Sequence, residues 1–116
     1  MKSKDKFRGC LIGGAVGDAL GYPVEFLNEA EITREYGEDG ISEYKLRHGV
    51  AEISDDTQMT LFTACGLLYG ETRFTLRGIR ARPENYISLC YKDWYKTQTK
   101  SYPLENQDTE DAVFRS

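Results

Sequence analysis

The segment Ser54-Asp55-Asp56-Thr57 places two carboxylates and two hydroxyls next to one another. It is the segment of this chain whose side chains are best suited to bind a ligand or take part in a reaction. A serine or aspartate at the start of a helix can cap the first turn, and an acidic side chain there complements the helix dipole. Taken alone, the segment is explained most simply as a capped helix. Capping needs only one of these side chains, however, and adjacent like charges are costly unless a cation lies among them.

Carboxylate and hydroxyl oxygens are hard donors, which suit Mg²⁺ or Mn²⁺ better than zinc. The four side chains supply too few oxygens to fill an octahedral shell. Water or other protein groups must therefore complete the coordination of one ion, and a second ion needs further carboxylates.

A second segment, residues 13–25, is unusual for its glycines. Gly13, Gly17 and Gly21 recur every four residues within a stretch whose apolar residues have helical spacing. Glycine inside a helix costs about 1 kcal/mol relative to alanine. We therefore expect another helix or a ligand to pack close to this backbone. Nucleotide-loop motifs are excluded, because the Lys-Ser/Thr pair is missing and no strand precedes the glycines.

Two acidic residues belong to this second segment. Glu25 follows the glycine-rich helix in a short turn, and it can meet Asp55 and Asp56 if the two segments pack together. Paired acids near a metal indicate hydrolysis, with one carboxylate positioning or deprotonating water. For Asp18 the sequence favours neither of two interpretations, a polar side chain satisfied by backbone groups or a member of the site.

Apolar periodicity predicts helices at residues 4–20, at 28–35 with Asn28 as cap, from the acidic segment to about Gly70, and at 83–96. A further helix is predicted to begin at about Thr109. Residues 38–53 are predicted to form a long loop, which is uncommon in a compact domain unless it serves a site. No segment shows convincing strand alternation. The predicted fold class is therefore all-α, a helical bundle.

Composition and charge limit the classes of partner and the location that we expect for this protein. The chain has 116 residues and a net charge of -4, with no dense stripe of lysine and arginine, so nucleic acid is not an expected partner. No apolar run approaches the roughly 20 residues that span a bilayer. The basic N-terminus lacks a signal-peptide cleavage site, so we expect a cytoplasmic protein. Three widely spaced cysteines, Cys10, Cys65 and Cys90, form neither a disulfide framework nor a zinc ribbon and are expected to be buried.

The two segments together resemble the ADP-ribosylglycohydrolase family, which includes the dinitrogenase reductase-activating glycohydrolases. The similar residues are 8–21 with Pro23 and Glu25, and 54–60, in the same order and separation; residues 91–98 are a weaker match. The resemblance implies an all-helical fold with two Mg²⁺ or Mn²⁺ ions between helices. It also implies hydrolysis of the bond that links ADP-ribose to a protein side chain or a small molecule.

Roles for individual residues come from the same resemblance. Ser54, Asp55 and Asp56 are implied as ligands of one half of the metal site, with both aspartates also counted as catalytic. Glu25 is implied to lie on the loop that covers the ribose, where it positions water or substrate. Asp18 is grouped with Glu25 as a substrate-binding residue.

Members of this family are longer than this chain, and a later Asp-x-Asp-Ser/Thr segment supplies their remaining metal ligands. Residues 108–111 do not match that segment. We therefore expect residues 1–116 to be the N-terminal portion of a larger domain that carries half of the metal site. Two alternatives remain open: an inactive helical fragment that forms homo-oligomers or binds a partner chain, and a hydrolase of another nucleotide-like substrate.

Overall fold

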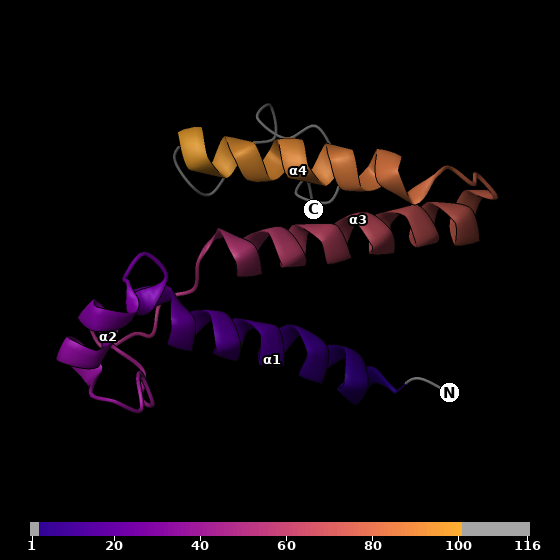
Figure 1. The fold of residues 1–116 in the computed structure, drawn as a ribbon. Helices are drawn as coiled ribbons and strands as arrows, with labels where there is room; N and C mark the ends of the chain where they lie inside the picture. The colour runs from indigo at the N-terminus through magenta and orange to yellow at the C-terminus, as the bar shows by residue number, and fades with distance from the viewer. Residues whose placement is uncertain (1–2, 101–116) are drawn as a thin grey trace. The chain divides into compact units, whose positions relative to one another are not determined.

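The computed structural model describes residues 3–100, and every regular element in that range is a helix (Figure 1). The elements in chain order are α1 (Lys4–Gly21), the short 3-10 turn η1 (Tyr22–Val24), α2 (Glu29–Tyr36), α3 (Asp55–Arg77) and α4 (Pro83–Thr99). The described residues divide into two compact units, one that ends at Thr57 and one that begins at Gln58. The predicted all-α class is confirmed. The helix predicted to begin at Thr109 lies outside the described residues.

The bounds of α1 follow from local chemistry. The Ser3 hydroxyl accepts a hydrogen bond from the Lys6 amide at 3.4 Å and caps the helix. α1 ends at Gly21, although the backbone of Tyr22 is still helical and η1 begins there. Pro23 has no amide hydrogen, so it cannot continue the hydrogen-bond ladder of the α-helix. Prediction and structure differ here by one residue.

The face of α1 that carries its repeated glycines is open within the described residues. A Cβ placed on Gly13, Gly17 or Gly21 meets no atom within 4 Å. The predicted close packing of another helix against this backbone is therefore not found there. Ala19 is the buried residue of α1, so the helix makes its contacts in this unit near its C-terminal end.

A complete capping box starts α2. The Asn28 side chain accepts a hydrogen bond from the Glu31 amide at 2.9 Å, and the Glu31 carboxylate accepts one from the Asn28 amide at 2.8 Å. Gly37 ends the helix with a φ of 91°, a conformation that favours glycine. The helix predicted here from the Asn28 cap is confirmed.

The connection from α2 to α3 is the long loop that the sequence predicts. Its one described bridge joins Arg47 to Val50, with His48 and Gly49 at positive φ in the turn between them. The Lys45 ammonium donates a hydrogen bond to the Glu35 carboxylate at 3.0 Å, which ties the loop to α2. The loop returns the chain to α1, where the acidic segment begins.

α3 runs seven residues past Gly70, where the sequence predicts its end, and stops at Arg77. Gly70 was expected to end the helix because glycine has low helix propensity. Packing against α4 overrides that propensity. Together with Gly66 it allows α4 to approach: a Cβ on Gly66 lies 2.8 Å from the Ile87 Cα, and one on Gly70 lies 2.8 Å from the Tyr86 ring.

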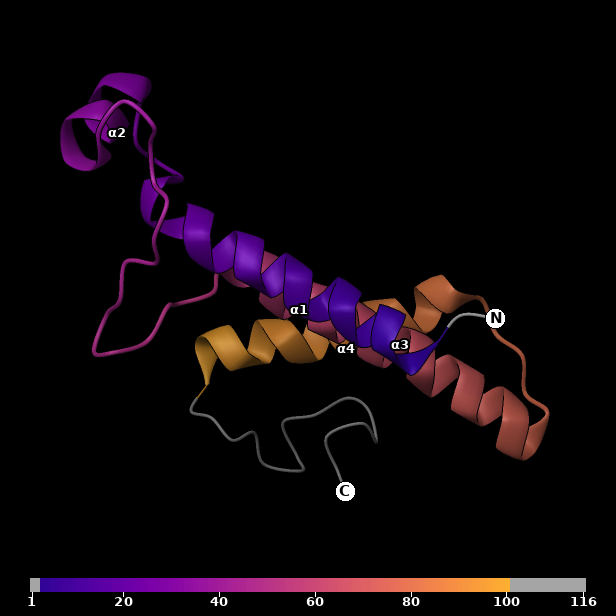
Figure 2. The same ribbon diagram turned by 90° about the horizontal axis from the view of Figure 1, so that it is seen from below.

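In the second unit, α3 and α4 lie side by side and antiparallel (Figures 1 and 2). Tyr86 and Cys90 of α4 are buried, and the rings of Tyr69 and Tyr86 meet edge to face with centroids 5.2 Å apart. The hydroxyls of Thr63 and Tyr91 share a hydrogen bond of 2.5 Å. The predicted burial of Tyr86 and Cys90 is confirmed, whereas Ile87, Tyr91 and Trp94 are half-buried.

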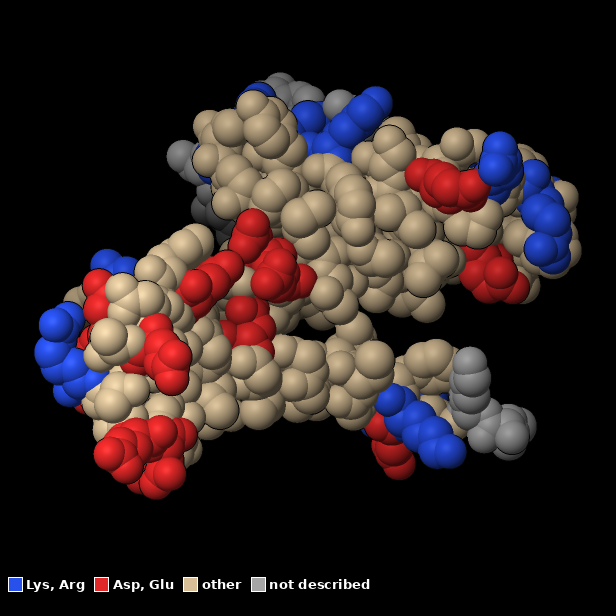
Figure 3. Space-filling view, viewed as in Figure 1, with Lys and Arg blue, Asp and Glu red and all other residues tan. Residues whose placement is uncertain are grey.

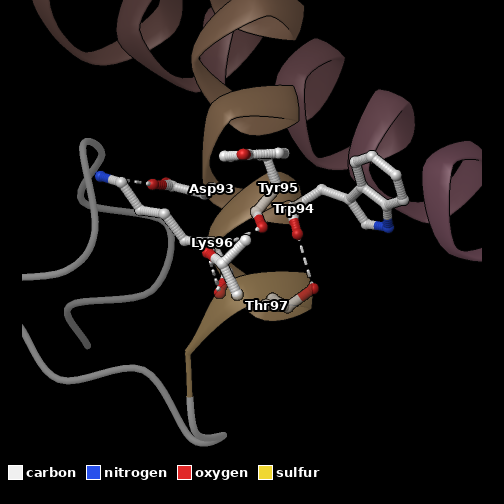
Figure 4. A network of polar contacts seen from close by, with 6 residues as sticks. Asp93, Trp94, Tyr95, Lys96 and Thr97 are labelled. Atoms are coloured by element: carbon white, nitrogen blue, oxygen red, sulfur yellow. Dashed lines mark hydrogen bonds and ion pairs between the residues drawn. The ribbon is translucent and has the colours of Figure 1, made fainter.

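The C-terminal turns of α4 carry a polar arrangement that the sequence did not predict. Asp93 is fully buried and forms an ion pair with Lys96 at 3.8 Å. The indole of Trp94 leaves α4 on the other side (Figure 4). It donates a hydrogen bond to the Gln58 side chain at 3.1 Å. Thr97 donates to the Trp94 carbonyl at 2.6 Å.

The three cysteines are free thiols, as predicted, but their burial differs from the prediction. Cys90 is buried, Cys65 is half-buried and Cys10 is exposed. Cys10 lies on α1, where little other structure covers the helix in this unit. Burial raises the pKa of the Cys65 thiol. Among residues 3–100 no single helix is long and apolar enough to cross a membrane, although residues 4–24 and α2 reach that threshold together as a pair bent by 97°.

Replacing Gly66 by alanine tests the close approach of α3 and α4. The new methyl group must displace the backbone at Ile87. Overpacking of this kind costs about 1–3 kcal/mol, against a gain of about 1 kcal/mol from helix propensity. We expect a net loss of up to about 2 kcal/mol in the free energy of unfolding, measured by urea unfolding with far-UV circular dichroism.

Gly17→Ala is the matched control, because its Cβ meets open space. It should leave stability unchanged or raise it by up to about 1 kcal/mol. Equal destabilisation by both substitutions would contradict the close helix approach at Gly66.

Candidate functional site

Near the C-terminal end of α1, the carboxylate of Asp18 joins two segments that are far apart in sequence. Its Oδ2 accepts hydrogen bonds from the Ser54 amide at 2.7 Å and from the Thr57 hydroxyl at 2.5 Å. Its Oδ1 accepts a hydrogen bond from the Ser54 hydroxyl at 2.7 Å. The three bonds hold the start of α3 against the end of α1 within the first unit.

The two hydroxyl residues are the buried part of this arrangement. Ser54 is 5% exposed and Thr57 is 6% exposed. The Ser54 Oγ also accepts a hydrogen bond from the Asp56 amide at 3.1 Å, which caps α3. The capped-helix interpretation of this segment is therefore correct, and Ser54 has a second function beyond the cap.

Asp18 is held as a carboxylate. Burial by itself raises its pKa, but the hydrogen bonds from Thr57 and Ser54 outweigh that effect and leave the pKa below its usual value. Each of these donors favours the charged form. Asp18 is consequently ionised at neutral pH.

The acidic side chains around this anchor face solvent. Asp55 and Asp56 are exposed on the first turn of α3, and Glu25 is exposed where η1 ends. A hollow of about 250 Å³ is lined by Asp18, Gly21, Tyr22, Glu25 and Asp56. The structure therefore brings Glu25, Asp18 and Asp56 to one hollow, while Asp55 is not among the lining residues.

Acidic side chains gather on the surface around α2, the end of α1 and the start of α3 (Figure 3). The oxygen donors of Ser54, Asp55, Asp56 and Glu25 fit a hard cation such as Mg²⁺ in chemical type. Within residues 3–100, however, no three acidic, histidine or cysteine side chains are grouped so that they could hold a metal ion. The described residues thus fit part of a coordination shell. The assignments of Ser54, Asp55 and Asp56 to metal, and of Asp18 and Glu25 to substrate, stay predictions.

Sequence reasoning missed how the two segments are joined. It treated Asp18 as satisfied by backbone groups or as a site residue, whereas two of its three donors are side-chain hydroxyls. It also missed the hydrogen bonds from Trp94 and Gln98 to the Gln58 side chain, at 3.1 and 3.3 Å. The available signal was the pair of hydroxyl residues that flank the two aspartates.

Thr57→Val tests the anchor, because it keeps the side-chain shape and removes one donor. Hydrogen bonds to charged groups contribute about 1.5–3 kcal/mol, and water can partly replace the donor at the half-buried Asp18. We expect a loss of roughly 1–2 kcal/mol in the free energy of unfolding, and Thr57→Ser should recover most of it.

The control for this substitution is Thr33→Val on the exposed side of α2, which should change stability by less than about 0.5 kcal/mol. Urea unfolding measures both. A loss at Thr33 as large as that at Thr57 would show that the hydroxyl of Thr57 contributes nothing specific.

Comparison with known proteins gives two similar relatives. An uncharacterized protein of Archaeoglobus fulgidus is 40% identical over 94 residues, which cover 79% of this chain and 28% of the relative. The ADP-ribosyl-(dinitrogen reductase) glycohydrolase of Rhodospirillum rubrum is 43% identical over 61 residues, which cover 49% of this chain and 20% of the relative. The chain therefore spans less than a third of the length of these relatives. No solved structure matches it.

The family comparison covers the whole sequence. Residues 1–116 match the family model described as ADP-ribosylglycohydrolase. That range includes the glycine-rich end of α1, Glu25 and the acidic start of α3, which carried the resemblance seen in the sequence. The chain belongs to the ADP-ribosylglycohydrolase family.

Proposed function

We propose that this chain forms one side of a Mg²⁺- or Mn²⁺-dependent site that hydrolyses the bond between ADP-ribose and a protein side chain or small molecule. The observation that carries the proposal is the hollow lined by Asp18, Glu25 and Asp56 beside the anchored start of α3. Family membership supports the reaction class. The name of the Rhodospirillum rubrum relative supports an ADP-ribosylated protein as one kind of substrate.

In this proposal Ser54, Asp55 and Asp56 hold the cation with their oxygens. The bound cation supplies charge that polarises the substrate and orients water. Asp55 and Asp56 lie on the first turn of α3, so the hydrogen bonds of Ser54 and Thr57 to Asp18 fix the part of the backbone from which they extend. Such support keeps ligands in position before the ion arrives.

Glu25 is the residue proposed to act on the reacting groups. Its carboxylate is exposed, follows η1 and lines the same hollow as Asp56. A carboxylate in that place can accept a proton from water as the water attacks the anomeric carbon of the ribose. The hydrogen-bonded Asp18 is less suited to this task, because its oxygens already accept three bonds.

The rest of the coordination shell is proposed to come from outside residues 3–100. The described residues contain no complete group of metal-binding side chains, and the chain spans only 28% and 20% of its two relatives. A cytoplasmic location, and the absence of nucleic acid and membrane as partners, remain predictions from the sequence.

A second candidate function is association with a copy of this chain or with a partner chain. Large apolar side chains of α1 are exposed, with Phe7 at 58%, Ile12 at 62% and Val16 at 46%. Exposed apolar patches of this kind favour association. Light scattering on the purified protein separates the two cases, since association through α1 should be lost when Ile12 is replaced by glutamate.

Titration with Mn²⁺ tests the metal site directly. We expect the wild-type protein to bind Mn²⁺ in isothermal calorimetry, and Asp55→Asn and Asp56→Asn each to weaken binding by about tenfold or more, because each removes a charged oxygen ligand. Asp39→Asn makes the same chemical change on an exposed turn outside the site and should leave the affinity unchanged. Equal binding by all four proteins, or by none, would contradict the idea that this chain alone holds the metal through Asp55 and Asp56.

Release of ADP-ribose from an ADP-ribosylated arginine or serine peptide tests the reaction. In a preparation that releases ADP-ribose, Glu25→Gln should lower kcat by about 10²-fold or more, the usual contribution of a general base. Binding of Mn²⁺ should change much less. A kcat that is unaffected by Glu25→Gln would remove Glu25 from the reaction.

A further inference from the structure

The Ser54 hydroxyl makes two hydrogen bonds, which leave one position for a further partner. A serine hydroxyl has one proton and two lone pairs. The proton is donated to Asp18 Oδ1 at 2.7 Å, and one lone pair accepts the Asp56 amide at 3.1 Å. One lone pair is left. Without the bond to Asp18, the proton is free to rotate into that remaining position.

We propose that Asp18 is a positioning residue that acts through Ser54. By accepting the hydroxyl proton, the Asp18 carboxylate leaves Ser54 with a lone pair, and not a proton, to offer to a cation. The part of this inference that concerns the cation rests on the proposed function. The part that concerns the direction of the hydroxyl rests on the hydrogen bonds alone.

The pattern of donors explains why this position requires a carboxylate. All three partners of Asp18 are donors, two of them from Ser54 and one from Thr57. A carboxylate accepts at both oxygens, whereas the amide of asparagine has one accepting oxygen and one donating nitrogen. In Asp18→Asn the amide nitrogen donates to one hydroxyl, most directly that of Ser54. The Ser54 oxygen then accepts twice, and its proton occupies the position where a cation would bind.

Asp18→Asn also removes a negative charge, which by itself weakens the attraction for any nearby cation. Combining it with Ser54→Ala separates the two effects. A charge effect adds to the loss caused by Ser54→Ala. An effect that acts through the Ser54 hydroxyl disappears once that hydroxyl is gone, so the two losses are less than additive.

The experiment measures Asp18→Asn, Ser54→Ala and the double variant in two ways. Without metal, urea unfolding should show that Asp18→Asn lowers the ratio of folded to unfolded protein by about tenfold in the wild-type background, and by clearly less in the Ser54→Ala background. With Mn²⁺, calorimetry should show about tenfold weaker binding for Asp18→Asn, the usual effect of losing a group that orients a ligand. That loss should shrink when Ser54 is already alanine. Asp39→Asn serves as the control in both measurements.

Each result decides the matter. Additive losses in the metal-free unfolding measurement overturn the inference, whatever Mn²⁺ does. Two outcomes with Mn²⁺ also overturn the inference but leave the proposed function standing. In one, the wild-type protein binds Mn²⁺ and Asp18→Asn does not weaken that binding. In the other, the losses of affinity caused by Asp18→Asn and Ser54→Ala are additive. No binding of Mn²⁺ by the wild-type protein overturns the idea that this chain alone holds a cation and, with it, the positioning role of Asp18 toward that cation. Coupling in both measurements supports the inference.

Discussion

The carboxylate of Asp18 is the interaction on which the first unit depends. It accepts three hydrogen bonds from Ser54 and Thr57, residues 36 and 39 positions later in the chain. Closing a loop of that length costs conformational entropy, which grows only slowly with length. Charge-assisted hydrogen bonds are roughly twice as strong as neutral ones, and three of them at one carboxylate offset much of that cost. Among residues 3–57 the one buried apolar residue is Ala19, which makes the polar anchor more important.

α3 serves two purposes along its length. Its first turn carries Asp55 and Asp56, and its later turns carry Gly66 and Gly70, which let α4 approach closely. Glycine lowers helix stability, but the absence of a side chain permits backbone contact with Ile87 and packing of the Tyr86 ring. The hydrogen bond from Trp94 to Gln58 extends the α4 contact to the beginning of the helix. The residues that follow the acidic pair are therefore fixed by the second unit's own packing.

Local signals predicted the elements whose ends depend on local chemistry. Pro23, the Asn28 capping box and Gly37 act through neighbouring residues, so the bounds of α1 and α2 followed from the sequence. The end of α3 did not, because Gly70 is stabilised by Tyr86 from another helix. The same limit affected the glycines: those of α1 repeat regularly yet lie open, whereas Gly66 and Gly70 are the pair that packs.

At the candidate site, residue types predicted which acidic residues belong to it. They did not predict the hydrogen bonds that join the two segments. The sequence indicated that Glu25 can meet Asp55 and Asp56 if the two segments pack together, and in the structure Glu25 and Asp56 line one hollow. The partners of Asp18 could not be predicted, because spacing alone does not say which carboxylate accepts a hydrogen bond from a distant hydroxyl.

The hydrogen bonds of Asp18 distinguish it from the other residues of the acidic cluster. Asp18 keeps its charge through hydrogen bonds from the protein and requires no cation. Glu25, Asp55 and Asp56 lie at the surface, where their side chains are exposed. In the half-site that we propose, the anchor at Asp18 is in place before any ion binds. A cation held there together with groups from elsewhere would replace water around that anchor.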